Sequence, residues 1–221
     1  VDEITELGMS FNIMIGKIKP RHAKEIQASR ISIGAEMMDR DYTTYANWRE
    51  YLGPLGVKKA RIQSGWAKCE KEKGVYDWRW LDEIIYDMVD QGVEPWVDLC
   101  YGNTVYPGGG GTTLQQKALP DSEEALTAWE NYVKAIVQRY RQYVDEWEIW
   151  NEPNYGINTA KYASLVARTA KAIKSVQPGA TVIGLALGSG VDYKYANEVL
   201  SELQKINAVS LIDQIAHHRH I

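Results

Sequence analysis

The sequence lacks several features that mark well-defined classes of protein. It has only 2 cysteines in 221 residues, no apolar run that approaches the length of a bilayer span, and fewer basic than acidic residues, 25 against 29. Two cysteines do not make a disulfide framework, so we expect Cys69 and Cys100 to be free thiols. The formal charge of −4 argues against nucleic acid or an anionic membrane as a partner.

Phenylalanine is nearly absent from an otherwise aromatic sequence. There is 1 Phe against 8 Trp and 14 Tyr, so almost every large ring carries a hydrogen-bonding edge. Carbohydrate sites use such rings, and so do protein cores and surfaces. A small or neutral ligand therefore fits this composition better than a polyanion does.

Short apolar runs rich in Val and Ile alternate with amphipathic stretches of helical period, which is typical of repeated βα units and a parallel sheet. The expected strands cover residues 30–37, 57–63, 93–100, 145–151, 181–187 and 211–218. The expected helices cover residues 42–52, 77–91, 121–143, 159–176 and 192–207. Asp121 and Glu124 predict a capping-box start for the third helix. We expect one βα domain over 31–221, preceded by an N-terminal cover segment over 1–30.

The glycine run PGGGG at 107–111 has two interpretations. A phosphate-binding loop needs a following Lys-Ser or Lys-Thr pair, which is absent. A mobile loop after the third strand is the simpler interpretation, and in a barrel it would border the binding cleft.

The run EIWNEPN, residues 148–154, stands where the fourth expected strand ends. Barrel enzymes carry their chemistry at the carboxyl ends of strands. The period of a strand puts Glu148, Trp150 and Glu152 on one side. A carboxyl group beside Trp rings is poorly solvated, so we expect the pKa of Glu152 to rise, as a proton donor requires. A surface glutamate at a strand end stopped by Pro153 is the plainer alternative.

EIWNEPN resembles the strand-four motif of the clan A glycoside hydrolases, which are TIM (β/α)8 barrels. The resemblance implies that Glu152 is the general acid/base and that Asn151 hydrogen-bonds the sugar 2-hydroxyl. Residues 60–85, ARIQSGWAKCEKEKGVYDWRWLDEII, are similar to the second-strand region of the β-xylosidase and α-L-iduronidase family. There Arg61 matches an arginine that keeps the nucleophile ionised, as a nearby guanidinium does. A packing role with a salt bridge to Glu148 is the alternative for Arg61, and both can hold.

The end of the sequence, IDQIAHHRHI at 212–221, is similar to the sixth strand of the same family, where a histidine and a tyrosine reach the site. His218 matches the histidine. His220 stands where the family usually has a tyrosine that contacts the nucleophile. We therefore do not expect that contact to be made in the same way here. A metal site is the alternative for this cluster, but no carboxylate motif accompanies it, and strand alternation separates His217 from His218 and His220. We expect no metal and no cofactor.

Further side chains at or near strand ends are candidates for contact with substrate. Glu36 and Asp98 can reach a central site, although no spacing makes either of them a nucleophile. For each aromatic candidate a place in the core is about as good an explanation. These aromatic candidates are Trp66, Trp96, Trp150, Tyr101 and Tyr155.

The resemblance implies retaining hydrolysis, in which one carboxyl attacks the anomeric carbon and the other protonates the leaving oxygen. The two carboxyls stand about 5 to 5.5 Å apart in such enzymes. The family's nucleophile is a glutamate at the end of strand seven, whereas six strands can be found here. A whole barrel has eight strands and about 250 residues. We therefore expect about six βα units, a nucleophile located C-terminal to this sequence or on another chain, and no turnover by this chain alone.

The predicted function is a glycoside hydrolase whose partner is an oligosaccharide or glycoside. Two alternatives remain: a carbohydrate-binding barrel that has lost its nucleophile, and a barrel of unrelated chemistry. Sugar and linkage depend on loops that a single sequence does not decode. A secreted or periplasmic location is favoured over the cytoplasm, because glycan-degrading enzymes are often exported, although residues 1–17 do not resemble a signal peptide.

Overall fold

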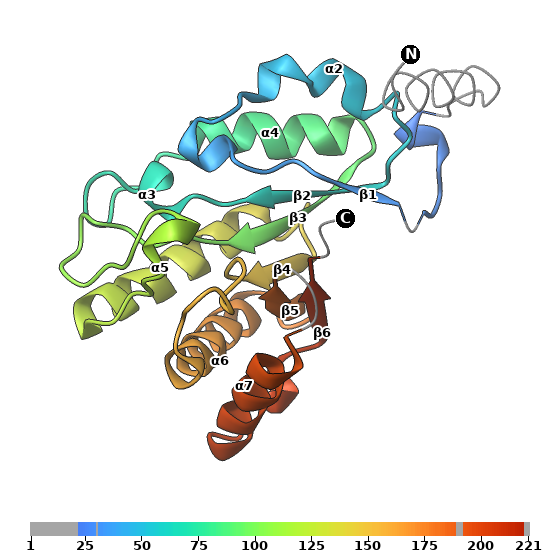
Figure 1. Cartoon of the computed structure of the whole chain (residues 1–221). Coiled ribbons are helices and arrows are strands. Elements are labelled where there is room, and N and C mark those ends of the chain that lie inside the picture. The colour runs from blue at the N-terminus through green and yellow to red at the C-terminus, as the bar shows by residue number, and fades with distance from the viewer. Residues whose placement is uncertain (1–21, 30, 189–191, 219–221) are drawn as a thin grey trace, which may run out of the picture.

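Six parallel strands form one curled sheet in the order β1-β2-β3-β4-β5-β6 (Figure 1). The structure, a computed structural model, describes residues 22–29, 31–188 and 192–218. The strands are β1 Ser32–Gly34, β2 Lys59–Gln63, β3 Glu94–Leu99, β4 Glu146–Ile149, β5 Thr181–Leu187 and β6 Gln214–His217. All six predicted strands are present, and their sequential parallel order confirms the six-unit part of a (β/α)8 barrel.

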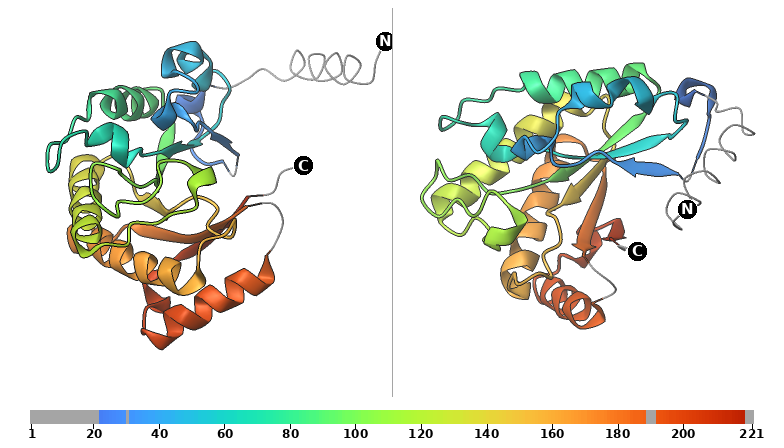
Figure 2. Two further views of the ribbon diagram at one scale, coloured as in Figure 1. Left: turned by 60° about the vertical axis from the view of Figure 1, so that its left-hand side comes forward. Right: turned by 45° about the horizontal axis from the view of Figure 1, so that its top comes forward.

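Helices cover the outer face of the sheet (Figure 2). They are α2 Arg49–Leu52, α3 Trp66–Cys69, α4 Arg79–Asp90, α5 Glu123–Tyr140, α6 Thr159–Val176 and α7 Tyr193–Lys205. Short 3-10 turns are η1 Ala23–Glu25, η2 Met38–Arg40, η3 Tyr45–Asn47, η4 Leu114–Gln116 and η5 Val209–Leu211. The predicted helix over 42–52 is only two single turns, because Trp48, with φ −142° and ψ 0°, interrupts it. No helix in the described part of the chain is both long and apolar enough to cross a membrane.

Polar side chains begin the two long helices. Ser122 accepts a hydrogen bond from the Ala125 amide at 3.1 Å, so α5 starts from Ser122 and not from the predicted Asp121. Asn158 accepts from the first amides of α6. These bonds satisfy backbone donors that have no partner within the helix.

The two faces of the sheet have opposite character. Side chains that point into the helix layer are apolar and fully buried, among them Ile62, Val97, Trp147 and Val182. The concave face carries charged and polar groups, among them Lys59, Arg61, Trp96 and Glu146. The alternation along each strand therefore separates the hydrophobic core from a polar interior that is available for chemistry.

An aromatic cluster fills the space between the sheet, α3 and α5. Trp66 stacks on Tyr132 with ring centroids 5.9 Å apart and meets Trp129 edge-on at 5.4 Å. The polar edges have partners: Trp129 donates to the Thr169 hydroxyl at 2.8 Å, and Tyr132 donates to a backbone carbonyl. A core can use Trp and Tyr in place of Phe where the polar edges are bonded, as they are for Trp129 and Tyr132.

The structure also places the two cysteines and residues 22–29 of the N-terminal segment. Cys69 and Cys100 are buried and free, as predicted. The Ala23 amide donates to the Gly53 carbonyl at 2.9 Å, and Ala23 is buried. Residues 1–21 and 30 lie outside the described residues, so the cover segment over 1–30 stays a prediction.

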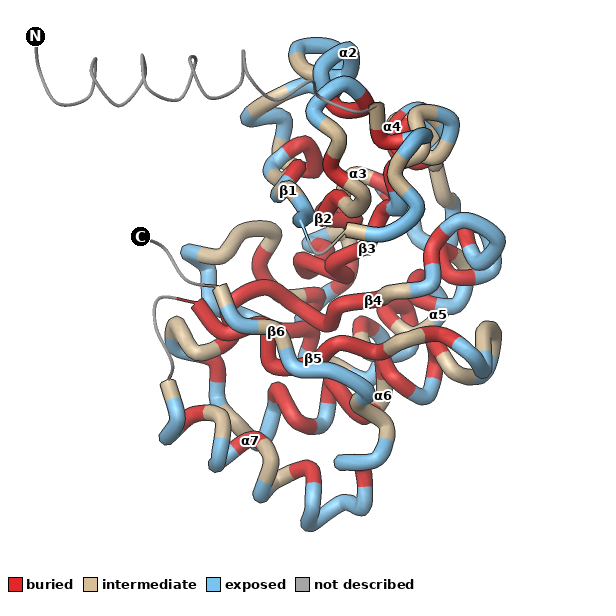
Figure 3. The backbone as a smooth tube through the Cα atoms, turned by 90° about the vertical axis from the view of Figure 1, so that its right-hand side faces the viewer, coloured by how far each residue is buried: buried red, intermediate tan, exposed pale blue. Residues whose placement is uncertain are grey.

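The outermost strands are the exposed ones (Figure 3). Ile31, next to β1, is 68% exposed, and Ile215 in β6 is 56% exposed. Within the described residues, β1 pairs only with β2, and β6 only with β5. Both edges therefore present unpaired backbone groups and apolar side chains, which natural sheets usually cover.

The glycine run lies in a loop between β3 and α5, as predicted, and this loop is packed against its own backbone. The Gly102 amide donates to the Gly111 carbonyl at 2.7 Å, and the Asn103 amide donates to the Gly109 carbonyl at 2.8 Å. A Cβ on Gly109 would lie 1.8 Å from the Asn103 carbonyl oxygen. Glycine is required there because two backbone segments touch.

We expect Gly109→Ala to lower the free energy of unfolding by about 1 to 3 kcal/mol, the usual cost of overpacking, because the methyl group would meet backbone atoms. Gly179→Ala is the matched control, since a Cβ there meets nothing within 4 Å. We expect the control to change stability by less than about 0.5 kcal/mol. Denaturant unfolding of both variants measures the difference, and equal stabilities would contradict the packed loop.

Candidate active site

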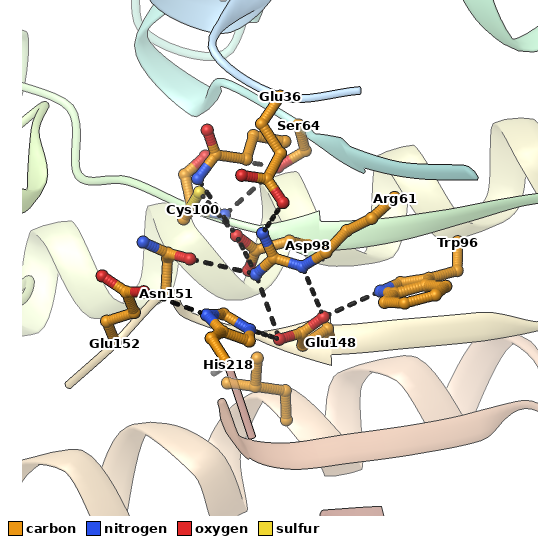
Figure 4. A network of polar contacts seen from close by, with 12 residues as sticks. Glu36, Arg61, Ser64, Trp96, Asp98, Cys100, Glu148, Asn151, Glu152 and His218 are labelled. Carbon is orange, nitrogen blue, oxygen red and sulfur yellow. Dashed lines mark hydrogen bonds and ion pairs between the residues drawn. The ribbon is translucent and has the colours of Figure 1, made fainter. Parts of the chain in front are cut away.

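Side chains from separate strands meet on the concave face near the carboxyl ends of the strands (Figure 4). Arg61 comes from β2, Glu148 from β4, and Asn151 and Glu152 from the turn after β4. His218 follows β6 directly. An open cavity of about 950 Å³ is lined by Arg61, Glu152 and His218 among others.

Arg61 is the centre of the network. Its Nε and Nη2 donate to the two oxygens of Glu148 at 2.8 and 3.0 Å. Its Nη1 donates to Glu36 at 2.6 Å, and Nη2 also donates to Asn151 Oδ1 at 3.0 Å. Burial opposes the charge, but the neighbouring Asp98 and Glu148 raise the pKa of Arg61. The salt bridge that the sequence left as an alternative is thus present in the structure.

Glu148 is fully buried, and four hydrogen bonds end on its carboxylate. Besides the two from Arg61, Trp96 Nε1 donates at 2.8 Å, and His218 Nε2 lies 3.2 Å away. Burial alone would raise the pKa of Glu148, but hydrogen bonds from His218, Arg61 and Trp96 outweigh it and lower the pKa to about 2. Glu148 is therefore a fixed negative charge at the floor of the site.

His218 links the two glutamates. Its Nε2 contacts Glu148 Oε1 at 3.2 Å, and its Nδ1 contacts Glu152 Oε1 at 3.1 Å. Burial by itself would lower the pKa of His218, but the hydrogen bonds to Glu148 and Glu152 raise it to about 9. At neutral pH the ring is therefore an imidazolium, in which both nitrogens donate.

Glu152 is held at the rim of the cavity by an unusual backbone. Its φ is 50° and that of Trp150 is 64°, values that residues with side chains rarely adopt. The Glu152 amide donates to the Ala186 carbonyl at 2.9 Å. A Cβ on Gly188 would lie 2.7 Å from the Glu152 carboxyl carbon and 2.5 Å from the Tyr155 ring. Backbone strain of this kind concentrates at functional sites, where surrounding contacts maintain it.

Asn151 is held at both ends of its amide. Oδ1 accepts from Arg61, and Nδ2 donates to the Tyr101 hydroxyl at 2.8 Å. Asn151 and Tyr101 are 7% and 2% exposed. The amide therefore has one orientation next to Glu152.

Asp98 lies below the cavity and does not line it. Its side chain is fully buried, and Oδ2 is 3.1 Å from Arg61 Nη2. Burial raises the pKa of Asp98 to about 7, against the attraction of Arg61 and with added repulsion from Glu148. Of the two buried carboxyls on one guanidinium, Glu148 carries the charge, and Asp98 is a supporting group.

Two of the aromatic candidates are corrected. Trp66 is 0% exposed, and its Nε1 donates to Glu70, so its ring belongs to the aromatic cluster and cannot stack on a sugar. Trp150 is 2% exposed and packs edge-on against the Tyr101 and Trp129 rings. The positive φ of Trp150 breaks the strand alternation, so Trp150 leaves the face of Glu148. Glu152 still reaches the same side as Glu148, since His218 contacts both carboxylates.

The other candidates lie nearer the cavity. Glu36, with 38% of its side chain exposed, and the half-buried Trp96 line it. Tyr155 lies beside Gly188 and the Glu152 carboxyl. His220 lies outside the described residues. Within the described ranges, no group of three or more His, Cys, Asp or Glu side chains could hold a metal ion.

Two residues that support the site do not appear among the candidates from the sequence. Asn154 accepts from the Gly188 amide at 2.9 Å and donates to the Gly188 carbonyl at 3.1 Å, which ties the turn after β4 to the end of β5. Gln63 accepts from Arg40 at 2.5 Å. The second asparagine of the EIWNEPN run was the available signal for Asn154, and the position of Gln63 at the end of the expected strand over 57–63 was the signal for Gln63.

Comparison with known proteins identifies the family. Residues 59–220 match the family described as glycosyl hydrolases family 39. The chain belongs to this family. It is 26% identical over 132 residues to a β-xylosidase of Geobacillus stearothermophilus, which is 54% of this chain and 26% of that protein. It is 31% identical over 109 residues to mannan endo-1,4-beta-mannosidase F of Aspergillus clavatus, which is 45% of this chain and 25% of that protein.

A solved structure of a family 39 glycoside hydrolase from Bacteroides cellulosilyticus has the same fold. It superposes with a TM-score of 0.64 at 24% identity, over 90% of this chain and 39% of that chain. The predicted clan A barrel and its β-xylosidase-like family are thereby confirmed. The chain spans about a quarter of the length of the two curated relatives. The roles of the individual site residues stay predictions.

We expect Glu148→Gln to lower the pKa of His218 from about 9 towards its ordinary value of 6.5, because the imidazolium loses a charged partner. NMR titration of the His218 ring protons measures this. Glu146→Gln is the matched control, since Glu146 lies two residues earlier on the same face of β4 and pairs with Lys59. An unchanged His218 pKa in Glu148→Gln would contradict the network.

The free energy of unfolding should depend on pH through the charges of His218 and Glu148. The pKa of His218 is raised in the fold, so its contribution is complete below about pH 6.5 and is lost as pH rises through about 9. The pKa of Glu148 is lowered, so its contribution is complete above about 4.5 and is lost as pH falls towards 2. We expect the stability advantage of the wild type over His218→Asn to shrink between pH 6.5 and 9. Urea unfolding at several pH values tests this, and a constant difference would refute it.

Proposed function

We propose that this chain forms the acid/base side of the catalytic barrel of a retaining glycoside hydrolase, with Glu152 as the general acid/base. One observation carries the proposal: the Glu152 carboxyl lies at a cavity on the carboxyl-end face of the sheet, bonded to an imidazolium that Glu148 anchors. Membership of family 39 supports the reaction class. The names of its relatives support an oligosaccharide or glycoside substrate with xylose-like or mannose-like units.

The contacts suit the two steps of a retaining reaction. Glu152 first gives its proton to the leaving oxygen and then takes a proton from water. His218 Nδ1, 3.1 Å from Glu152 Oε1, holds the Glu152 carboxyl group in one orientation for both steps. Because Glu148 holds the other ring nitrogen, the imidazole cannot turn away from Glu152.

Arg61 and Asn151 position the sugar in this proposal. Arg61 fixes the Asn151 amide from one side and Tyr101 fixes it from the other. A preorganised amide beside the acid/base can bond the 2-hydroxyl without first losing conformational freedom. Glu36, which shares Arg61 and is partly exposed, is placed to accept a hydrogen bond from another sugar hydroxyl.

The nucleophile is the second carboxylate that the proposal needs. Asp98 is shut off from the cavity, so it does not suit the role. Glu36 follows β1 and not a seventh strand, where the resemblance puts the nucleophile, so we do not assign it this role. The open edge of β6, with its exposed Ile215, supports a further strand beside it as the source of this group. The alternative, a carbohydrate-binding barrel without catalysis, predicts no carboxylate at the end of such a strand. Sequencing the native polypeptide beyond Ile221 distinguishes the two.

We expect Glu152→Gln in the native protein to slow hydrolysis of glycosides with poor leaving groups by about 10² to 10⁴-fold, the usual value of general acid catalysis. Aryl glycosides with good leaving groups should lose less at the bond-breaking step, because they need no proton there. Steady-state rates with both substrate types measure the effect, and Glu202→Gln, on α7 and outside the cavity lining, serves as the control. Full activity in Glu152→Gln would rule out the assigned role.

A further inference from the structure

The strand β5 departs from regular pairing near its carboxyl end, a feature that has no role in the chemistry described so far. The register between β5 and β6 shifts between Gly184 and Leu187, where β5 has one residue more than β6. Leu185 and Ala186, which form this bulge, are buried and have φ values of 68° and 39°. Bulges are rare between parallel strands and are over-represented next to active sites. Positive φ at residues with side chains persists only where surrounding contacts maintain it.

The bulge reverses the directions of the backbone carbonyls that follow it. Along a parallel strand, the carbonyls point alternately to the two neighbouring strands. The Val182 carbonyl accepts from the Asp213 amide, on the β6 side, at 2.9 Å, so in a regular strand the Ala186 carbonyl would also face β6. It instead accepts from the Glu152 amide, on the β4 side, at 2.9 Å. The extra residue therefore allows β5 to hold the turn that carries Glu152.

The next carbonyl of β5 holds the partner of Glu152. The Leu187 carbonyl accepts from the His218 amide at 2.6 Å. Two consecutive carbonyls thus fix the backbones of Glu152 and His218, whose side chains meet at 3.1 Å between Oε1 and Nδ1. Without the extra residue the two carbonyls would exchange directions, and this pair of backbone bonds could not form.

A tyrosine on α6 stands where β4 and β5 separate. Regular pairing between these strands ends at Glu148 and Ile183, and a continued ladder would next join the Leu185 amide to the Ile149 carbonyl. The Tyr162 hydroxyl takes this place and donates to the Ile149 carbonyl at 2.8 Å. Burial raises the pKa of Tyr162 well above its ordinary value, and a hydrogen bond with the Leu185 backbone opposes the rise. The neutral hydroxyl therefore bridges the two strands.

We propose that Tyr162 is a positioning residue for the acid/base, because its hydroxyl keeps the bulge in place and the bulge sets the separation of Glu152 and His218. The inference rests on the proposed function of Glu152. A hydroxyl between two strands fixes both of them at one point, which a direct ladder bond could do only by removing the bulge.

Both segments that the Tyr162 hydroxyl joins lead directly to the site. Ile149 is the last residue of β4, and the turn that carries Glu152 follows it. Leu185 immediately precedes Ala186, whose carbonyl holds the Glu152 amide. Tyr162 is fully buried, so it acts through the backbone and does not contact substrate.

Tyr195 on α7 provides a matched control. Its ring centroid lies 6.5 Å from that of Tyr162. Its hydroxyl is buried and has no hydrogen-bond partner among the residues that the structure describes. Tyr162→Phe and Tyr195→Phe each remove one buried hydroxyl from neighbouring rings, but only the first removes a bond to the strands.

Single-turnover hydrolysis by the native protein tests the positioning role. We expect Tyr162→Phe to slow the bond-breaking step about 10- to 100-fold for glycosides with poor leaving groups, because a small displacement of a catalytic group costs about this much. Glycosides with good leaving groups need no proton at that step and should lose much less. A general loss of stability would lower both rates alike. Tyr195→Phe should change neither rate.

NMR titration of the His218 ring provides a readout that needs no turnover. We expect the His218 pKa of about 9 to fall in Tyr162→Phe, because the contact with Glu152 lengthens, and to stay unchanged in Tyr195→Phe. Hydrogen exchange of the wild type needs no variant, so it still decides if Tyr162→Phe does not fold. The Glu152 and His218 amides should exchange as slowly as those of the paired strands.

The outcomes separate this inference from the proposed function. If Glu152→Gln slows the poor leaving groups but Tyr162→Phe matches Tyr195→Phe in rates and in the His218 pKa, the inference is refuted and the proposed function stands. Fast exchange of the Glu152 amide in the wild type would also refute the inference alone. Full activity in Glu152→Gln would remove the proposed function and the inference with it.

Discussion

The buried ion pair between Arg61 and Glu148 is the interaction on which the concave face depends. Both groups are almost fully removed from water, and a buried charge is tolerated only when it is paired and hydrogen-bonded. Two bonds join them, and Trp96 and His218 fill the remaining positions on the carboxylate. Such a pair adds little net stability compared with apolar residues, so its value here lies in the orientation it imposes on its neighbours.

The ion pair orients the groups that face the cavity. The strands that carry it also build the apolar core on the other face of the sheet. Towards the cavity, Glu148 keeps His218 charged and aimed at Glu152, while Arg61 fixes Asn151. Away from it, the same strands place apolar side chains against the helices, where an aromatic cluster provides much of the packing. The alternation along the strands is what allows a charged interior and an apolar core to lie one sheet apart.

The fold was largely predictable, and the site was predictable in part. Every strand and the four longer helices were found from hydrophobic period, and the motif around Glu152 gave the catalytic hypothesis. The importance of Glu148 was not visible, because in sequence it is one more acidic residue in an alternating run. Trp66 and Trp150 were candidates for sugar contact, yet a ring near a strand end can turn to the core as easily as to the cavity. Only packing decides between the two.

The sequence by itself determined the βα repeat, the six parallel strands and the position of a carboxyl group where the fourth strand ends, because periodicity and motif spacing are local properties. The tertiary structure alone decided which groups share protons and charge. His218 is 66 residues from Glu152 and 70 from Glu148, and their contacts exist only because the curled sheet brings β4 and β6 together. Burial, which opposes the charged forms of Glu148 and His218, is likewise a property of the assembled sheet.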